Sequence, residues 1–312
     1  MYSFLGLDEA GYGPNLGPLV VSVTRWSLPR PAAACDLYGL LADAVSAESH
    51  CGETRLHVAD SKQVYSPGRG LGSLETTALA LLAQLGRNVE TLHDLWNALG
   101  GDLPADLEPW FADEVTLPLV AKRETVDRLS GQLRSAMERS AVRIEVLASD
   151  IVQTARFNRL TTQYDSKGGA LSNVTLGLLA RHWSPDRDPE TLVVLDKHGG
   201  RNRYDNLLLT AFPETFPQCL AEGRECSRYR VGRHECRFQT KAEAHLPVAA
   251  ASILSKYTRE VSMEAFNRFW QRHAPELKGT KGYPEDAARF RRDVQPIQKR
   301  LRISDEIFWR SR

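Results

Sequence analysis

The sequence predicts an α/β fold in which strands and helices alternate along much of the chain. Two short apolar runs, 3–7 and 19–23, flank a stretch rich in glycine and proline, a pattern typical of strand, turn and strand. A β-branched run over 191–195 indicates a buried strand. Pro247 opens a long segment of good helix formers. Such alternation predicts helices layered against a sheet.

The first half of the chain combines this opening with a helical region. The first strand is expected to end at Asp8, where the turn-like stretch AGYGPNLGP begins soon afterwards. Residues 27–112 are rich in Ala, Leu, Gly and Pro and are interpreted as a helical region or insertion. Within it, helical patterns lie at 74–84 and 89–99.

The second half supplies the remaining sheet and helices. The expected elements are an extended segment at 115–121, a helix at 123–139, a strand at 142–147, one or two strands within 228–240 and a helix over 248–270. Residues 257–312 are expected to be helical and partly basic. Their basic stretch contains Arg289, Arg291, Arg292, Lys299, Arg300 and Arg302, with Asp293 among them. It forms either a solvated helix face or a face that contacts phosphates.

The net charge, the apolar segments and the cysteines limit the classes of protein that the sequence allows. The formal net charge is +1, so any attraction to nucleic acid has to come from a local patch. No segment approaches the roughly 20 apolar residues of a membrane span and no signal peptide is recognisable, which predicts a soluble, cytoplasmic protein. The cysteines form no CxxC pair and are expected to be reduced thiols. They are Cys35, Cys51, Cys219, Cys226 and Cys236.

Three carboxylates follow predicted strands. Asp8 comes after FLGL, Asp196 after TLVVL, and Glu243 after RFQTK. In open α/β sheets, ligands gather outside the carboxyl ends of strands. Oxygen ligands of this type suit Mg²⁺ or Mn²⁺, and a pair of such ions roughly 4 Å apart can hydrolyse phosphodiesters. The pattern therefore indicates a two-metal site.

Whether Glu9 belongs to this set of metal ligands depends on where the first strand ends. Adjacent residues of a regular strand point to opposite faces, so Asp8 and Glu9 reach one site only if the strand ends there. Gly11 and Gly13 favour such an ending. Taken singly, each carboxylate has another interpretation: Glu9 as a surface residue and Asp196 as a turn cap.

Five segments in sequence order supply further context. They are Gly6-Leu7-Asp8-Glu9-Ala10-Gly11-Tyr12-Gly13-Pro14 continuing to Gly17-Pro18-Leu19-Val20, Asp60-Ser61-Lys62, Val193-Val194-Leu195-Asp196, Thr240-Lys241-Ala242-Glu243 followed by the small-residue helix 248–256, and Lys281-Gly282-Tyr283. Together they resemble motifs of the type 2 ribonuclease H family, which includes ribonucleases HII and HIII. The resemblance covers the beginning of the chain and the part after about residue 150. Residues 27–56 and 63–140 are largely unmatched.

The resemblance implies a ribonuclease H-like fold, with a mixed five-stranded sheet flanked by helices and a helical insertion at 27–112, in a single catalytic domain over 1–312. It also implies hydrolysis of the RNA strand of an RNA/DNA hybrid or of a ribonucleotide-containing duplex, leaving 3′-hydroxyl and 5′-phosphate ends. The implied catalytic and metal-binding residues are Asp8, Glu9, Asp196 and Glu243, with Mg²⁺ or Mn²⁺ as cofactor.

The resemblance also implies substrate-binding residues, namely Gly11, Tyr12, Gly13, Lys62, Ser252, Lys256 and Tyr283. Each has a plainer alternative. The glycines suit a tight turn, the Asp60-Ser61-Lys62 segment suits a helix start, and Ser252 suits a local cap. Lys256 and Arg259 contact phosphates or face water, and His198 either shuttles a proton or is a surface residue.

Three positions depart from the family pattern. In the ribonuclease HII pattern, the fourth carboxylate lies ten positions before the serine of the small-residue helix, and this position is Ala242 here. The nearest carboxylate is Glu243. The segment Thr-Lys-Ala-Glu that contains it is more similar to ribonuclease HIII. Tyr12 stands where ribonuclease HII has a cationic residue between two glycines. The glycines still allow the backbone to approach a sugar and sense a 2′-hydroxyl. Tyr283 resembles a tyrosine of ribonuclease HII that packs on a deoxyribose, which implies that the chain combines features of both subfamilies. Its plainer alternative is amphipathic packing near the surface.

Two other functions remain open at this point. One is another nuclease of the same fold, acting on a different structured nucleic acid. The other is a hybrid-binding protein with reduced catalysis, which the set of four carboxylates disfavours because it gathers negative charge where phosphates must lie. Motifs for acyl transfer, nucleotide triphosphate hydrolysis and hydride transfer are absent. No protein partner is implied, and a monomer is expected.

Overall fold

A seven-stranded mixed sheet forms the centre of the computed structural model, which describes residues 1–48, 54–65, 68, 70–100 and 106–311. The order of the strands is β5-β2-β1-β6-β9-β8-β7. β1 runs parallel to β6, and β6 runs parallel to β9; the other neighbours are antiparallel. The strands are β1 (Tyr2–Ala10), β2 (Leu19–Leu28), β5 (Arg143–Val152), β6 (Thr191–Asp196), β7 (Pro217–Ala221), β8 (Cys226–Val231) and β9 (His234–Gln239).

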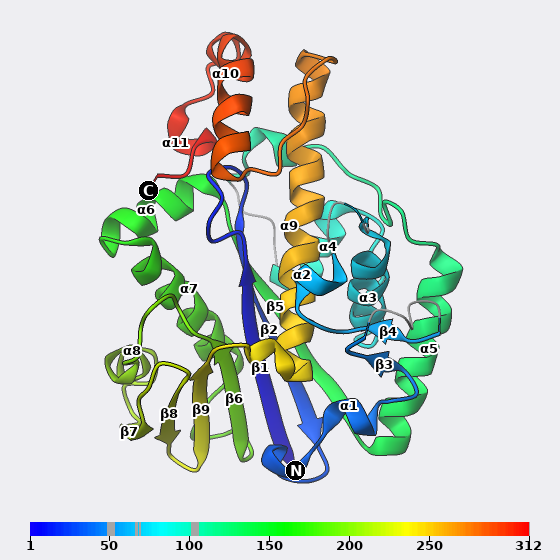
Figure 1. Cartoon of the computed structure of the whole chain (residues 1–312), viewed down its shortest axis with the longest axis vertical. Helices are drawn as coiled ribbons and strands as arrows, with labels where there is room; N and C mark the ends of the chain where they lie inside the picture. Colours follow the sequence, from blue (N-terminus) through cyan, green and yellow to red (C-terminus); the bar gives the residue numbers. More distant parts are fainter. Residues whose placement is uncertain (49–53, 66–67, 69, 101–105, 312) are drawn as a thin grey trace.

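Alternation along the central strands divides the core between the two faces of this sheet. Phe4 and Val194 pack in one hydrophobic cluster, whereas their neighbours Leu5 and Val193 pack in the other. The long helix α9 (Leu246–His273) covers the first face, and α7 (Lys167–His182) covers the second (Figure 1). The central strands are therefore buried on both sides, as their apolar sequences predict.

The remaining helices surround this core. They are α1 (Leu37–Leu40), α2 (Ser61–Val64), α3 (Gly72–Ala83), α4 (Leu92–Gly100), α5 (Arg123–Ser140), α6 (Thr154–Gln163), α8 (Asp205–Ala211), α10 (Pro284–Arg300) and α11 (Asp305–Phe308), with 3-10 turns η1 (Ala32–Ala34), η3 (Pro109–Phe111) and η4 (Ala242–Ala244). A small parallel sheet pairs β3 (Val45–Ser46) with β4 (Leu56–His57). The regular structure in the described part of 27–112 is thus mainly helical and packs on the α9 side of the sheet (Figure 1). The role of this region as an insertion stays a prediction.

The segment 115–121 differs from its expected extended form. It contributes only an isolated bridge between Thr91 and Thr116. The backbone N–H groups of 119–121 donate to the buried carboxylate of Glu75 instead of to a neighbouring strand. Pro118 has no N–H to give to a ladder, so the residues after it turn to a side-chain acceptor. The expectation was wrong because a proline within a run disfavours a strand.

The sheet is larger than the five strands expected. β7 and β8 extend it beyond β9 as an antiparallel pair. β7 lacks the β-branched alternation that identifies a half-buried strand, and its residues are mostly exposed. An edge strand of this kind leaves little pattern in the sequence.

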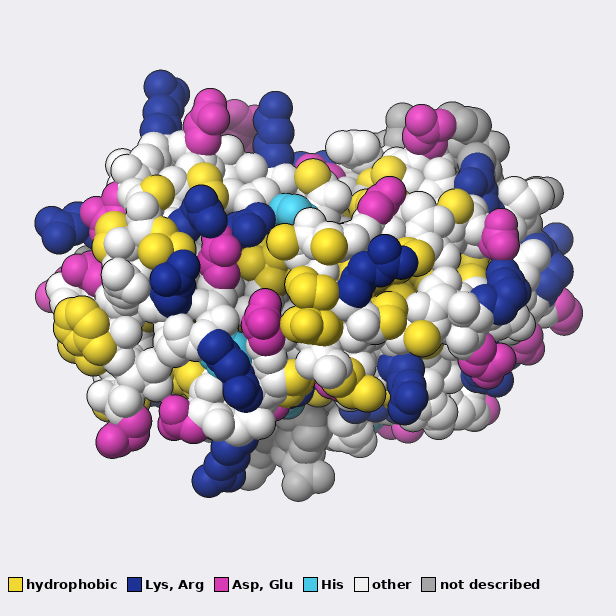
Figure 2. Space-filling view, turned by 90° about the horizontal axis from the view of Figure 1, so that it is seen from below, with side chains coloured by type: hydrophobic (Ala, Val, Ile, Leu, Met, Phe, Trp, Pro, Cys, Tyr) yellow, Lys and Arg dark blue, Asp and Glu magenta, His cyan; other side chains and the backbone are white. Residues whose placement is uncertain are grey.

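The C-terminal helices gather at one end of the molecule. α10 and α11 lie at the end of the molecule where α9 finishes, and α11 packs on α6 (Figure 1). Basic and acidic side chains are interspersed over the face that Figure 2 presents, as the small net charge suggests. No helix within the described ranges is long and apolar enough to cross a membrane. Of the cysteines, Cys35, Cys219, Cys226 and Cys236 carry free thiols, and Cys51 lies outside the described residues.

Helix α9 approaches β1 at backbone contact distance. A Cβ built on Gly6 would lie 2.3 Å from the carbonyl carbon of Pro247 and 2.3 Å from the amide nitrogen of Val248. Ala249, Ala250 and Ala251 follow on the helix and are fully buried. Small residues on both sides therefore allow the helix and the strand to touch.

We predict that Gly6→Ala destabilises the protein by about 2 kcal/mol or more, because an added methyl group must push two backbones apart. Urea unfolding of the purified variant measures this change. The matched control is Gly177→Ala on the exposed side of α7, where nothing lies within 4 Å of the built Cβ. That change should be neutral or stabilising by up to about 1 kcal/mol. Equal effects of both changes would contradict the prediction.

Candidate functional site

Four carboxylates lie at the C-terminal ends of three adjacent parallel strands. Asp8 and Glu9 belong to the end of β1, and Asp196 is the last residue of β6. Glu243 lies in η4, between the end of β9 and the start of α9. The parallel order β1-β6-β9 brings these positions to one edge of the sheet, which is where ligands collect in open α/β folds.

The strand β1 does not end at Asp8 as expected. It pairs with β2 through Ala10, so Asp8 and Glu9 lie within regular strand. Its pairing with β6, however, stops at Leu7. From Asp8 onward, β1 is therefore not paired with a parallel neighbour on that side. There is room beside these carboxylates because β1 stops pairing with β6 there, although β1 itself continues.

Electrostatic coupling supports this grouping. Burial raises the pKa of Asp8 well above its ordinary value, and the charges of Glu9 and Glu243 add to the rise. Burial also raises the pKa of Glu9 to about 7, again with contributions from Asp196 and Glu243. The pKa of Asp196 rises to about 6 from burial and from Glu243. Like charges have thus been brought together with incomplete compensation.

Lys62 is the cation that faces the cluster. Its charge lowers the pKa of Glu9 and of Asp196. The pKa of Lys62 is itself raised, most of all by Asp60 and then by Glu243, Asp8 and Asp196. Asp60 caps the short helix α2 by accepting from the backbone N–H of Lys62. The Asp60-Ser61-Lys62 segment therefore begins a helix, as one interpretation expected, and places Lys62 near the carboxylates. Its contact with substrate stays a prediction.

Ser252 lies between α2 and the carboxylates. Its hydroxyl pairs with that of Ser61, and its hydrogen bond to Asp8 lowers the pKa of that carboxyl group. One turn on, the Ser255 hydroxyl donates to the backbone carbonyl of Asp8. The small-residue face of α9 thus holds the end of β1 in place through serine hydroxyls.

The cluster fits a hard cation chemically. The Oδ1 atom of Asp196 is buried and has no hydrogen-bond partner, and such atoms ordinarily find one. A cation coordinated by these oxygens would supply the missing partner and offset the repulsion between the carboxylates. In the described ranges, no three His, Cys, Asp or Glu side chains are already arranged at ligand spacing. Asp8, Glu9, Asp196 and Glu243 are the residues that could hold such an ion.

A cavity of about 460 Å³ opens beside Glu243. The described side chains around it come partly from the N-terminal helical region and partly from the turn before α9. They are Tyr38, Ala47, Ala59, Asp60, Gln63, Lys241, Glu243 and Ala244. The helical region therefore forms part of the wall next to the carboxylates.

The turn after β1, residues 11–18, lies next to the site. Gly11 has φ of +92°, and a Cβ there would lie 2.6 Å from the carbonyl oxygen of Pro18. This position requires glycine, as the sequence suggested. Tyr12 is half-buried and Gly13 is exposed. A Cβ on Gly168, near the start of α7, would lie 3.7 Å from the Tyr12 hydroxyl.

Two of the proposed substrate-binding residues lie outside the carboxylate cluster. Lys256 forms an ion pair with Glu260 and stands over the ring of Tyr65. Tyr283 is 51% exposed and precedes α10. The backbone of its neighbour Gly282 accepts from two amides of the turn 11–18, which places Tyr283 beside that turn.

Sequence reasoning missed the burial of three polar side chains. Arg259 is 1% exposed and Arg310 is 0% exposed. His198 is also buried, with Nδ1 hydrogen-bonded to Ser172, and burial lowers its pKa to about 4. It is therefore not the surface residue that one of the two interpretations expected. Single arginines and histidines carry no burial signal in the sequence.

Comparison with known proteins finds no matching family model and no matching curated protein. Solved structures do match. The ribonuclease H2 of Pyrococcus horikoshii OT3 aligns with 98% of this chain and 92% of its own, at 15% identity and a TM-score of 0.45. The ribonuclease HII of Archaeoglobus fulgidus, solved in complex with PCNA, aligns with 99% and 94%, at 17% identity and a TM-score of 0.49.

A third match is Bst-RNase HIII, solved in complex with Mn²⁺. It aligns with 93% of this chain and 62% of its own, at 17% identity and a TM-score of 0.38. These alignments cover nearly the whole chain, at identities of 15–17% and TM-scores below 0.5. The predicted mixed α/β class is confirmed by the mixed sheet and the helices packed on it. Function is inferred from the chain's own residues.

We predict that Mn²⁺ or Mg²⁺ raises the melting temperature of the protein by several degrees, and that EDTA reverses the rise. Saturating a site 100-fold above its dissociation constant adds about 2.7 kcal/mol of stability. Asp8→Asn should remove most of this rise and should itself melt higher than the wild type without metal, because it removes one of the crowded charges. Differential scanning calorimetry measures both effects.

The control for this experiment is Asp127→Asn, which alters an exposed carboxylate on α5. It should keep the full metal-induced rise. A wild-type protein that melts at the same temperature with metal and with EDTA would contradict the prediction.

Proposed function

We propose that this protein is a divalent-metal-dependent endonuclease that hydrolyses the RNA strand of RNA/DNA hybrids and leaves 5′-phosphate and 3′-hydroxyl ends. The observation that carries the proposal is the gathering of Asp8, Glu9, Asp196 and Glu243 at the ends of three parallel strands. Support comes from the order of the five sequence motifs, which resembles that of type 2 ribonucleases H.

In this proposal, the carboxylates hold ions rather than protons. A pair of bound divalent ions would supply activation of the attacking water and stabilisation of the leaving 3′-oxygen. Asp8 is the most buried of the four, at 8% exposure, and is held from behind by Ser252 and Ser255. It is therefore the ligand whose position the fold restricts most strongly. Lys62 adds a positive charge at the rim, where a phosphate would approach.

The turn 11–18 supplies the group that would distinguish RNA from DNA. Within the described part of the chain, the backbone N–H groups of Tyr12 and Gly13 donate no hydrogen bond. They are free to contact a sugar, and only ribose offers a 2′-hydroxyl there. Tyr283 is exposed beside the turn and would pack against a neighbouring sugar.

A second candidate function is a nuclease of the same fold with another structured substrate. Tyr12 favours this candidate, because it replaces a cationic side chain between the two glycines. A hybrid-binding protein without catalysis is disfavoured by the incompletely compensated acidic cluster, which would repel phosphates unless cations are bound. The two enzymes differ in substrate choice, and both differ from the binder in metal-dependent cleavage.

The test is cleavage of four end-labelled substrates by the purified protein with Mg²⁺, Mn²⁺ or EDTA. The substrates are an RNA/DNA hybrid, a DNA duplex with one ribonucleotide, single-stranded RNA and a plain DNA duplex. We expect metal-dependent cutting of the hybrid only, with or without the single-ribonucleotide duplex. Cutting of plain DNA would favour the second candidate, and absence of cutting would favour the binder.

We predict that Asp8→Asn lowers the cleavage rate at least about 1,000-fold, equivalent to roughly 4 kcal/mol of barrier. Affinity for the hybrid should change only a few-fold, because the variant removes a metal ligand and not a phosphate contact. Single-turnover kinetics and fluorescence anisotropy measure the two quantities. Asp127→Asn should cleave at the wild-type rate. A fully active Asp8→Asn protein would refute the site assignment.

A further inference from the structure

Two buried arginines support the turn 11–18 from beneath, and neither forms an ion pair with an acidic side chain in the described part of the chain. Arg259 comes from α9 and Arg310 from the segment after α11. Both are almost completely buried. Burial lowers the pKa of each, and the charge of Arg259 adds to the effect on Arg310. Burying an unpaired charge lowers the free energy of unfolding, so the presence of two such arginines calls for an explanation.

Both guanidinium groups donate to carbonyl oxygens of the turn. Arg310 donates to the carbonyls of Gly11 and Tyr12. Arg259 donates to the carbonyls of Leu16 and Pro18, at 3.1 and 2.7 Å. The two arginines therefore hold the beginning and the end of one turn, and they turn its carbonyl oxygens inward.

Arg310 is itself held firmly. Its guanidinium lies 3.7 Å from the ring centroid of Phe157 on α6. Its backbone N–H donates to the carbonyl of Asn15, and the Asn15 side-chain amide donates to its carbonyl. Asn158, also on α6, donates to the carbonyls of Glu306 and Trp309. The segment 305–311 is thus fastened to both α6 and the turn.

The orientation of the carbonyls determines the orientation of the amides. In a planar trans peptide, the C=O and N–H bonds point in opposite directions. Because the Gly11 and Tyr12 carbonyls point inward to Arg310, the N–H groups of Tyr12 and Gly13 point away from it. Gly13 is exposed, so this outward side is open. The positive ends of two peptide dipoles are thereby presented at the surface of the turn.

We propose that Arg310, together with Arg259, is a positioning residue that orients the Tyr12 and Gly13 amides toward the substrate and so sets the preference for ribose over deoxyribose. This inference rests on the proposed function and deepens it. It also explains how the turn works with Tyr12 in place of a cation: the positive charge lies beneath the turn, on a side chain from the other end of the chain.

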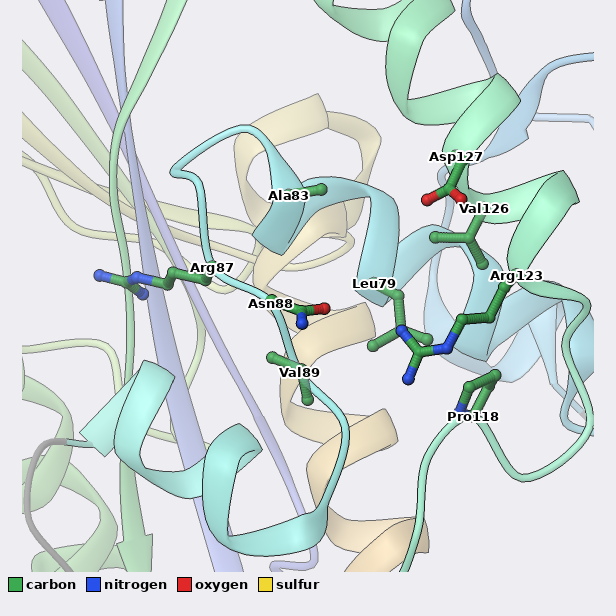
Figure 3. Close-up of a pocket in the computed structure, with 9 residues that line it drawn as sticks. All are labelled: Leu79, Ala83, Arg87, Asn88, Val89, Pro118, Arg123, Val126 and Asp127. Carbon is green, nitrogen blue, oxygen red and sulfur yellow. The ribbon is translucent and has the colours of Figure 1, made fainter.

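The experiment compares Arg310→Met, Arg310→Lys and a matched control in the full-length protein. The control is Arg87→Met. Arg87 likewise donates from a partly buried guanidinium to two carbonyls, of Ala98 and Leu147, in a different part of the molecule. Its side chain extends away from the neighbouring Asn88 and Val89 toward the strands (Figure 3). This variant loses a comparable structural contact without touching the turn.

The first measurement is the ratio of dissociation constants for a plain DNA duplex and an RNA/DNA hybrid of the same sequence, by fluorescence anisotropy with Ca²⁺. We expect Arg310→Met to lower this ratio about tenfold, which corresponds to one hydrogen bond's contribution to binding. Arg310→Lys should restore part of it, because lysine keeps a donor but lacks the fixed fork. Arg87→Met should leave the ratio within about twofold, whatever its melting temperature.

The second measurement does not depend on nucleic acid. Amide hydrogen exchange of Asn15 and Leu16, which donate to the Gly282 carbonyl, reports whether the turn is held. Exchange should accelerate in Arg310→Met and not in Arg87→Met. Unchanged exchange in a folded Arg310→Met protein would overturn the proposal even if the wild type cleaves hybrids. Equal loss of hybrid and DNA affinity would overturn the role in specificity.

A wild-type protein with no preference for the hybrid would overturn the proposed function and the role in specificity together. The hydrogen-exchange result would then still decide whether Arg310 holds the turn. Failure of the proposed function and failure of the positioning role are therefore distinguishable.

Discussion

The contact between α9 and β1 at Gly6 is the constraint on which the site depends. Because no side chain separates the two backbones, the helix runs directly along the strand that carries Asp8. Successive turns of α9 then meet different parts of that strand and its turn: Ser252 reaches the Asp8 carboxylate, Ser255 its backbone, and Arg259 the residues beyond. A larger residue at the crossing would shift this whole series together.

Charge is arranged unusually around this helix. Just beyond the crossing, several carboxylates crowd at strand ends with raised pKa values. Further in the same direction, two guanidinium groups are buried beneath a turn and form no ion pair with an acidic side chain among the described residues. Each arrangement by itself lowers the stability of the protein. In the proposed function, bound cations would offset the first arrangement and a polyanion the second. Local rules of stability are often broken where a protein binds its ligands.

Much of the fold could be predicted because its signals are local. The apolar runs of β1 and β6, the pattern of α5 and the proline at the start of α9 each lie within one element. The missed elements lack such signals. α7 contains three glycines and is stabilised by packing on the sheet rather than by helix propensity, and β7 is an exposed edge. The end of β1 was misplaced because loss of pairing with β6 is not a property of β1 alone.

The features of the candidate site likewise divide into those that the sequence predicts and those that only the folded chain shows. Residue identity and order along the chain were enough to select Asp8, Glu9, Asp196 and Glu243, because strand ends and short motifs are local features. Only the folded chain shows that these carboxylates lie close together, that Oδ1 of Asp196 has no hydrogen-bond partner among the described residues, and that Arg310 donates to the turn 11–18. Burial and charge coupling join residues that lie up to about three hundred positions apart, such as Gly11 and Arg310, and no window of sequence contains both.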